Sequence, residues 1–180
     1  MNKLLLILGI CFSITFQATA QNKRVKGEII KDFGEFAIVE NTDIKTDTAA
    51  TFKVIFDVSK SSENKNVINK YIVTAARFLN MHANEGMSKK QLKAAMTIHA
   101  SAWQDVLNND AYKEKFGIDN PNLKLINQLS EAGVDIILCG QTADYRGLNK
   151  DNVIPSVKFA LSAMTALLQY QNNGYIYMRF

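Results

Sequence analysis

Short runs of β-branched and aromatic residues alternate with longer segments of helical periodicity from residue 51 to the end of the chain. The runs 52–58, 92–99, 134–138 and 175–178 have the composition of strands. Two parallel strands need a crossover of about a dozen residues or more, and the intervening helical segments provide it. The alternation therefore predicts one α/β domain, a three-layer α/β/α sandwich with helices on both faces of a mainly parallel sheet.

Helices are expected between these strands and after the third of them. The helical spacing of apolar residues predicts helices over 67–81 and 103–116. Asn120 followed by Pro121 is a helix-start signal, with Asn as the N-cap and Pro at the first helical position. Pro155 is expected to open the last long helix. The apolar stripe of that helix would comprise Val157, Leu161, Met164 and Leu168.

Residues 1–20 are predicted to be a signal peptide rather than part of the fold. Lys3 provides a short positive region, residues 4–16 are apolar, and Ala18-Thr19-Ala20 forms a small-x-small cleavage pattern. Cleavage is expected after Ala20. Cys11 is an alternative lipid-attachment site, but the residue before it is isoleucine, where such a site needs a small residue.

Export would place the mature chain in the periplasm or outside the cell. Residues 21–50 are polar and irregular and are expected to form an N-terminal arm, followed by a single α/β domain over 51–180. No apolar run after the leader approaches the length of a membrane span, so no membrane attachment is expected after processing. Cys139 would be the only cysteine left, so a stabilising disulfide within the chain is excluded.

Composition argues against several classes of function. The formal net charge is +4 at pH 7 and the basic residues are scattered, whereas nucleic-acid binding needs a concentrated basic face. Two histidines and the cysteines lack the paired spacing of a metal site. The chain contains neither a phosphate-binding loop nor a Gly-x-Gly-x-x-Gly pattern. No metal and no organic cofactor are therefore expected.

Cys139 is the residue whose position most suggests chemistry. It follows an apolar run that reads as a buried strand, and functional groups in parallel sheets collect at the carboxyl ends of strands. If a helix starts at Gly140 and Gln141, their amides would stabilise the thiolate and lower the pKa of the thiol. An inert core cysteine is an equally open interpretation, because free cysteine is among the most buried residue types.

His99 is the second candidate, at the end of the run 92–99. If its strand lies next to the strand of Cys139, both residues open onto the same edge of the sheet. His99 would then assist the thiolate as a base or as a cationic partner. A structural histidine with satisfied hydrogen bonds is the alternative.

The chain resembles the DsrE/DsrF-like family, in particular its exported members. The matching segments extend over most of residues 51–180, and it is their order and spacing together that carry the resemblance. They are the run 52–58, Thr97-Ile98-His99, the stretch 112–122, Leu138-Cys139-Gly140-Gln141, the stretch 160–165 and Gly174-Tyr175.

The resemblance implies a three-layer α/β/α fold with a mainly parallel five-stranded sheet and assembly into homo- or hetero-oligomers, often trimers or hexamers. It also implies a sulfur relay in which a cysteine accepts sulfane sulfur as a persulfide, a role that falls on Cys139, with Gly140 and Gln141 lining the site. His99 matches a histidine common in the exported branch. There it is often followed by glycine, whereas Ala100 follows it here.

Two functions remain open on this basis, and whether the protein is an enzyme is left undecided. The first is sulfur handling by an exported protein through a persulfide on Cys139, with a sulfur donor or acceptor protein as partner. The alternative is a non-catalytic oligomeric binding module, in which a crevice between Cys139 and His99 holds a small ligand or a partner segment. A thiol redox sensor would need a second, resolving cysteine.

Overall fold

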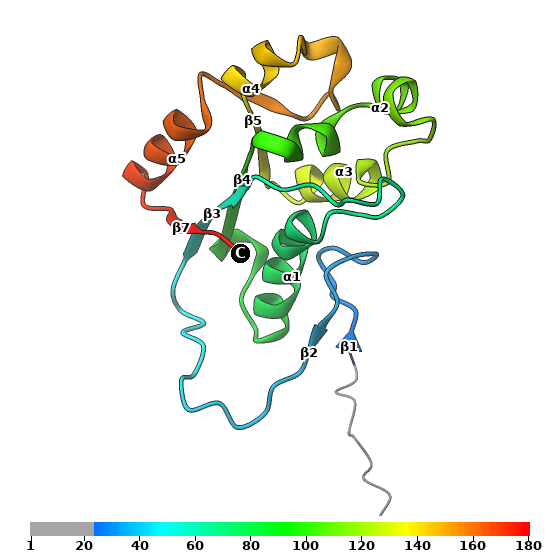
Figure 1. The fold of residues 1–180 in the computed structure, drawn as a ribbon. Helices are drawn as coiled ribbons and strands as arrows, with labels where there is room; N and C mark the ends of the chain where they lie inside the picture. Colours follow the sequence, from blue (N-terminus) through cyan, green and yellow to red (C-terminus); the bar gives the residue numbers. More distant parts are fainter. Residues whose placement is uncertain (1–23) are drawn as a thin grey trace, which may run out of the picture.

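The computed structural model describes residues 24–180, so the predicted signal peptide and its cleavage site lie outside the described residues. A five-stranded sheet in the order β6-β5-β4-β3-β7 runs through the domain, and all of its strand pairs are parallel (Figure 1). Its strands are β3 (Phe52–Val58), β4 (Leu92–Ile98), β5 (Asp135–Cys139), β6 (Lys158–Ala160) and β7 (Ile176–Met178). The predicted α/β fold with a parallel five-stranded sheet is confirmed.

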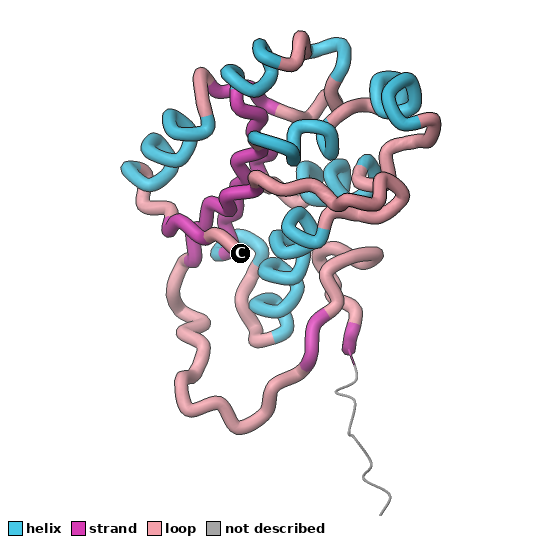
Figure 2. The backbone as a smooth tube through the Cα atoms, in the orientation of Figure 1, coloured by secondary structure: helices cyan, strands magenta, loops and turns pink. Residues whose placement is uncertain are grey.

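Helices lie on both faces of this sheet (Figure 2). Short 3-10 turns occur at Lys89–Gln91, Ala100–Val106 and Lys150–Asn152. The α-helices are α1 (Lys70–Asn84), α2 (Asn109–Phe116), α3 (Leu123–Glu131), α4 (Gly140–Tyr145) and α5 (Ala163–Asn172). Among the helices of residues 24–180, only α5 packs on the face opposite α1 and α3, so the two halves of the core differ in size.

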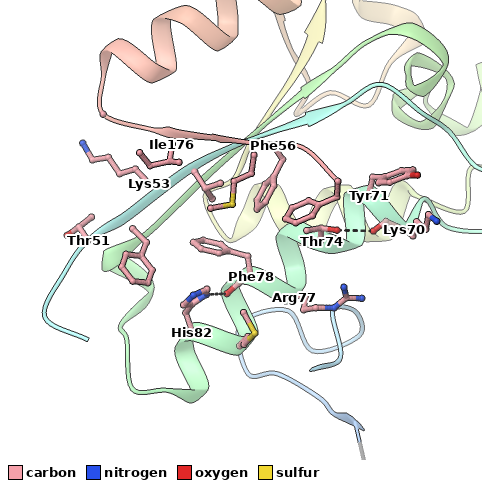
Figure 3. A pocket seen from close by; sticks show the side chains of 16 residues that line it. Thr51, Lys53, Phe56, Lys70, Tyr71, Thr74, Arg77, Phe78, His82 and Ile176 are labelled. Carbon is pink, nitrogen blue, oxygen red and sulfur yellow. Dashed lines mark hydrogen bonds between the residues drawn. The ribbon is translucent and has the colours of Figure 1, made fainter. Parts of the chain in front are cut away.

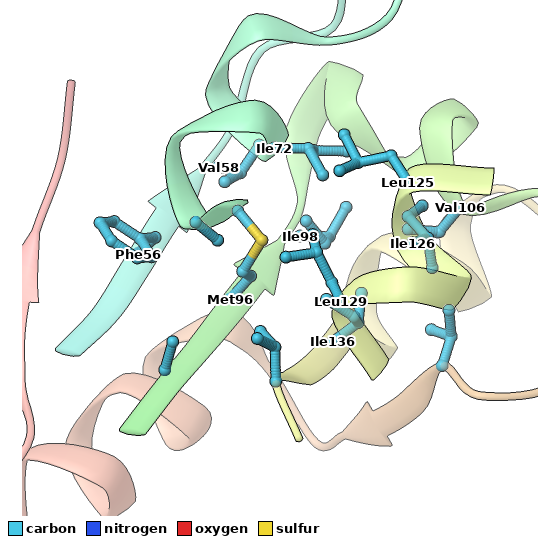
Figure 4. Close-up of a cluster of buried hydrophobic side chains, with 14 of the residues drawn as sticks. Phe56, Val58, Ile72, Met96, Ile98, Val106, Leu125, Ile126, Leu129 and Ile136 are labelled. Carbon is cyan, nitrogen blue, oxygen red and sulfur yellow. The ribbon is translucent and has the colours of Figure 1, made fainter. Parts of the chain in front are cut away.

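The larger half of the core lies under α1 and α3 (Figure 4). Ile72 of α1 and Leu129 of α3 pack against this face of the sheet together with Ile98 of β4, and each is fully buried. Complete burial of such a side chain stabilises the fold by roughly 1.5–3 kcal/mol. The smaller half, under α5, contains Ile55, Ala95, Ile137 and Ala166.

The N-terminal arm is anchored on α1 by one buried amide. Its two short strands, β1 (Arg24–Val25) and β2 (Phe36–Ala37), pair antiparallel. Ile30 lies in the segment that joins these two strands. The Asn80 side chain of α1 accepts a hydrogen bond from the Ile30 amide at 2.9 Å and donates to the Ile30 carbonyl at 3.0 Å. The buried amide thus replaces a strand partner for an otherwise irregular segment.

The predicted last helix from Pro155 is wrong in its first half. Residues 158–160 form β6, which pairs with β5, and α5 begins only after Ser162. The Ser162 hydroxyl caps α5 by accepting from the Thr165 amide at 3.0 Å. Of the expected apolar stripe, Val157 is buried in the core, whereas Leu161 and Met164 are each 72% exposed and Leu168 is 62% exposed. A strand of three residues spans little more than one repeat of the two-residue strand period, so local periodicity does not reveal it.

The predicted helix start at Asn120 is also wrong, and 103–116 is not one helix. The first part of that range belongs to a 3-10 turn, and α2 starts after its own cap, Asn108. Asn120 is buried and donates to the carbonyls of Asp105 at 2.9 Å and Leu107 at 2.6 Å. Because those buried carbonyls need a donor, Asn120 serves them, and α3 begins after Asn122.

Asp105 is the centre of this buried polar cluster and is 1% exposed. Its carboxylate accepts hydrogen bonds from Asn69 at 2.7 Å, Ser61 at 2.8 Å and Asn122 at 3.2 Å. Burial raises the pKa of Asp105 to about 6, against the opposing effect of these hydrogen bonds. The cluster ties the loops after β3 and β4 to the start of α3.

Candidate functional site

Cys139 is the last residue of β5 and the N-cap of α4. It stands in register with Ala160 of β6 and is 6% exposed. The apolar strand brings the sulfur to the carboxyl edge of the sheet, and the chain turns directly into a helix there. The thiol therefore lies just beneath the surface at a strand-to-helix junction.

Two helix starts converge on the Cys139 sulfur. Burial raises the pKa of the thiol, but interactions with the Thr142 hydroxyl and with the amides of Thr142, Ala163 and Gln141 outweigh that effect, and the pKa lies below its usual value. The Cys139 side chain makes no N-cap hydrogen bond in α4. Gln141 and Thr142 belong to the first turn of α4, and Ala163 is the first residue of α5. Amides at helix starts favour negative charge, so the site stabilises a thiolate.

Gly140 allows the close packing on which this arrangement depends. A Cβ atom at this position would lie 2.5 Å from the Ala160 carbonyl oxygen and 3.0 Å from that of Leu161. The requirement is for space, since Gly140 has no positive φ. Gln141, which is exposed, donates to the Leu161 carbonyl at 3.3 Å. Both residues predicted beside Cys139 thus contact the link between β6 and α5.

Gly140→Ala is expected to lower the free energy of unfolding by roughly 1–3 kcal/mol, because the added methyl forces the backbone of 160–161 outward. The same shift moves the Ala163 amide away from the sulfur and raises the pKa of Cys139. Urea unfolding and the pH dependence of thiol labelling measure the two effects. Gln141→Ala is the matched control and should change stability by less than about 0.5 kcal/mol. Equal behaviour of both variants would contradict this account.

His99 continues the β4 ladder by one residue, since its amide donates to the Val58 carbonyl at 3.1 Å. Its Nε2 lies 2.6 Å from Oδ1 of Asp57, whose side chain is 6% exposed. The Tyr177 hydroxyl donates to Oδ2 of the same carboxylate at 3.0 Å, and the Arg179 guanidinium lies 3.7 Å away. Asp57 thereby links the ends of β3, β4 and β7.

His99 and Cys139 are brought to the same edge of the sheet, as expected. Ile98 pairs with Leu138, so the next residues along each strand lie on neighbouring strands. Adjacent strands are about 5 Å apart. The His99 imidazole bonds Asp57, and within residues 24–180 no hydrogen bond or ion pair joins it to Cys139. The influence of His99 on the thiol stays a prediction.

Sequence reasoning missed Asp57, Thr142 and Ala163. Asp57 had a visible signal, because it is the only acidic residue in the apolar run 52–58. Thr142 also had a signal, because it comes three residues after Cys139, within the first turn of a helix that starts there. Ala163 had no local signal, since its helix starts at the end of a strand that the periodicity did not reveal.

The described part of the chain has neither a metal-binding cluster nor a membrane-spanning helix. Among residues 24–180, no group of three or more His, Cys, Asp or Glu side chains is placed to hold a metal ion. None of the helices in that range is long and apolar enough to span a membrane.

Comparison with known proteins places the fold. Comparison of the sequence with curated proteins found no match. The E. coli ychN protein has 15% identity, a TM-score of 0.55, and coverage of 72% of this chain and 100% of its own. The protein of unknown function MTH1491 from Methanobacterium thermoautotrophicum has 15% identity, a TM-score of 0.54, and coverage of 72% and 99%. The model of the DsrE/DsrF-like family matches residues 53–180, and the chain therefore belongs to that family.

Proposed function

We propose that this protein handles sulfur through Cys139, which carries a sulfane sulfur transiently as a persulfide. The observation that supports this most is the lowered pKa of Cys139, caused by interactions with the starts of α4 and α5 that outweigh burial. The family is associated with sulfur relay, and Cys139 stands where the family resemblance expects the accepting cysteine. The proposal requires no metal and no organic cofactor.

The loading step needs only a thiolate and a donor persulfide. The Cys139 thiolate attacks the terminal sulfur of R–S–SH, forming a new S–S bond as the old one breaks. R–S⁻ leaves with the electron pair of the broken bond, and Cys139 becomes Cys–S–SH, so charge and sulfur oxidation state balance. The amides that lower the pKa of the thiol would also stabilise the deprotonated persulfide.

An exposed apolar surface next to Cys139 suits a protein partner. Leu161 and Met164 are each 72% exposed and flank the start of α5, whose Ala163 amide contributes to the lowered pKa of Cys139. Leu168, one turn further along α5, is 62% exposed. Apolar side chains grouped in this way are typical of interaction surfaces. A second copy of the chain, or a sulfur donor or acceptor protein, would cover them when sulfur is passed.

The test is direct loading with inorganic polysulfide, followed by mass spectrometry of the peptide that contains Cys139. The parent protein should gain the mass of one sulfur atom, reversible by dithiothreitol. Cys139→Ser, which is nearly isosteric, should gain none while unfolding at the same temperature. A parent protein that never gains sulfur, in the test tube or when purified from its own host, would contradict the proposal.

A non-catalytic oligomeric binding module is the second candidate, and the low exposure of Cys139 favours it. In that case the thiol serves packing and reacts only when the protein is denatured. Native alkylation therefore separates the two functions.

Self-association is expected for the purified protein, because the family resemblance implies trimers or hexamers and Leu161, Met164 and Leu168 form an apolar surface. Light scattering should give a mass of several chains. Met164→Glu should reduce that mass, whereas Lys90→Glu, at an exposed site elsewhere, should not. A parent protein that remains a monomer at all concentrations would count against the proposed assembly.

Export is the remaining part of the proposal and rests on residues 1–20. N-terminal sequencing of protein recovered from outside the cytoplasm should begin at Gln21, because Ala18-Thr19-Ala20 fits the cleavage pattern. A mature protein that begins with a lipid-modified Cys11 would instead support membrane anchoring.

A further inference from the structure

A groove lies between α1 and the edge strand β7, on the face opposite α5. Ile176 and Met178 of β7 stand in register with Val54 and Phe56, whose side chains belong to the core under α1. The last crossover runs over the other face of the sheet through α5. The apolar side chains of β7 on the α1 side therefore remain 63% and 40% exposed, respectively.

The groove is large and apolar. Its volume is about 1070 Å³. Figure 3 shows Phe56 of β3 and Phe78 of α1 pointing toward one another in its lining, and their ring centroids are 6.0 Å apart in edge contact. Pockets that bury small ligands have volumes of roughly 300–1,000 Å³ and are mostly lined by apolar and aromatic side chains. The groove therefore has the size and the lining of a ligand site, and it does not include Cys139.

The charged side chains that line the groove are all basic. They are Lys53, Lys70 and Arg77, and no Asp or Glu lines it. Phe180, the last residue of the chain, also lines it. Lys53 donates to the Asn173 carbonyl at 3.2 Å and Arg77 to the Glu35 carbonyl at 3.3 Å, which leaves their charge uncompensated. Within residues 24–180 none of the three forms an ion pair with a carboxylate. An apolar groove with a basic rim is complementary to a molecule with an apolar body and an anionic end.

We propose that this groove binds a single-chain amphiphile with an anionic head, of the fatty-carboxylate class. The chain would lie on the aromatic floor between α1 and β7. The carboxylate would lie at the rim formed by Lys70 and Arg77, which are two helical turns apart on α1. This site is separate from Cys139, so its occupancy does not depend on sulfur transfer.

The methionine methyl groups provide a test by NMR with sodium laurate as the probe. Met81 and Met178 line the groove, so their methyl signals should shift and saturate. Met164 is 72% exposed on α5 and Met96 is fully buried, and neither should shift. Dodecyltrimethylammonium has the same chain length and the opposite charge, and it should bind at least about tenfold more weakly because the rim repels it.

Two pairs of variants locate the binding site. Thr74→Trp fills the groove from α1 and should weaken laurate binding at least about tenfold, whereas Asn84→Trp, exposed on the same helix outside the groove, should not. Lys70→Gln with Arg77→Gln should weaken binding about fivefold. Lys90→Gln with Lys93→Gln changes the net charge equally at exposed sites and should have no effect.

Three results would overturn the proposal. A shift of Met164 that parallels those of Met81 and Met178 would indicate general adsorption to apolar surface. Equal affinity for the cationic surfactant would remove the role of the basic rim. A decrease in the mass of the laurate-free protein caused by Thr74→Trp would show that a second copy of the chain covers the groove. None of these results bears on sulfur loading of Cys139.

Discussion

Cys139 should react with iodoacetamide in the native protein at a pH where an ordinary thiol, with a pKa of about 8.5, is still protonated. Interactions with Thr142, Ala163 and Gln141 lower its pKa, so the thiolate is populated at lower pH. Labelling of the peptide that contains Cys139, followed by mass spectrometry across pH, measures this. In Cys139→Ser the labelling of that peptide should disappear completely.

Thr142→Val is the informative variant, because the Thr142 hydroxyl is the largest of the groups that lower the pKa of Cys139. The labelling midpoint should move to higher pH. Thr74→Val makes the same change on α1, where the hydroxyl bonds only the Lys70 carbonyl, and should leave the midpoint unchanged. A Cys139 that labels only after denaturation would leave the persulfide function without support and favour the binding module.

Asp105→Ala should destabilise the protein by roughly 3 kcal/mol near pH 5. The substitution removes the acceptor shared by three buried side chains, Ser61, Asn69 and Asn122, and leaves a void. Urea unfolding followed by circular dichroism measures the loss. Asp119→Ala is the matched control, because that carboxylate is exposed and lies 3.8 Å from Lys113, and it should cost less than about 1 kcal/mol.

The loss of unfolding free energy caused by Asp105→Ala should become smaller as pH rises. The folded pKa of about 6 lies above the unfolded value of about 3.9, so the folded state binds the proton more tightly. The contribution of Asp105 is therefore fully present below pH 4 and is lost as pH rises through 6, with a total change of roughly 3 kcal/mol. The alanine variant lacks this dependence. If the difference in unfolding free energy between the parent and the variant grew from pH 5 to pH 7, the raised pKa of Asp105 would be contradicted.

Local patterns in the sequence were sufficient to predict the class of fold and the place of the cysteine within it. The strands 52–58, 92–98 and 135–139 lie close to their predicted positions because each is a mainly apolar run that is long enough to recognise from the sequence. The position of Cys139 before Gly140 follows from the same local information, since a buried strand that ends at glycine predicts a turn into the next element.

The surroundings of these residues depend on how the elements pack, which local patterns do not specify. Ala163 reaches the Cys139 sulfur because β6 pairs with β5, and the three residues of β6 have too short a pattern to be detected. Asp57 meets His99 because β3 and β4 are neighbours in the sheet order. The groove beside β7 exists because the last crossover runs over the opposite face. The periodicity of apolar residues predicts a helix or strand from residues that are close in the sequence. Contacts between elements depend instead on the order and handedness of the crossovers.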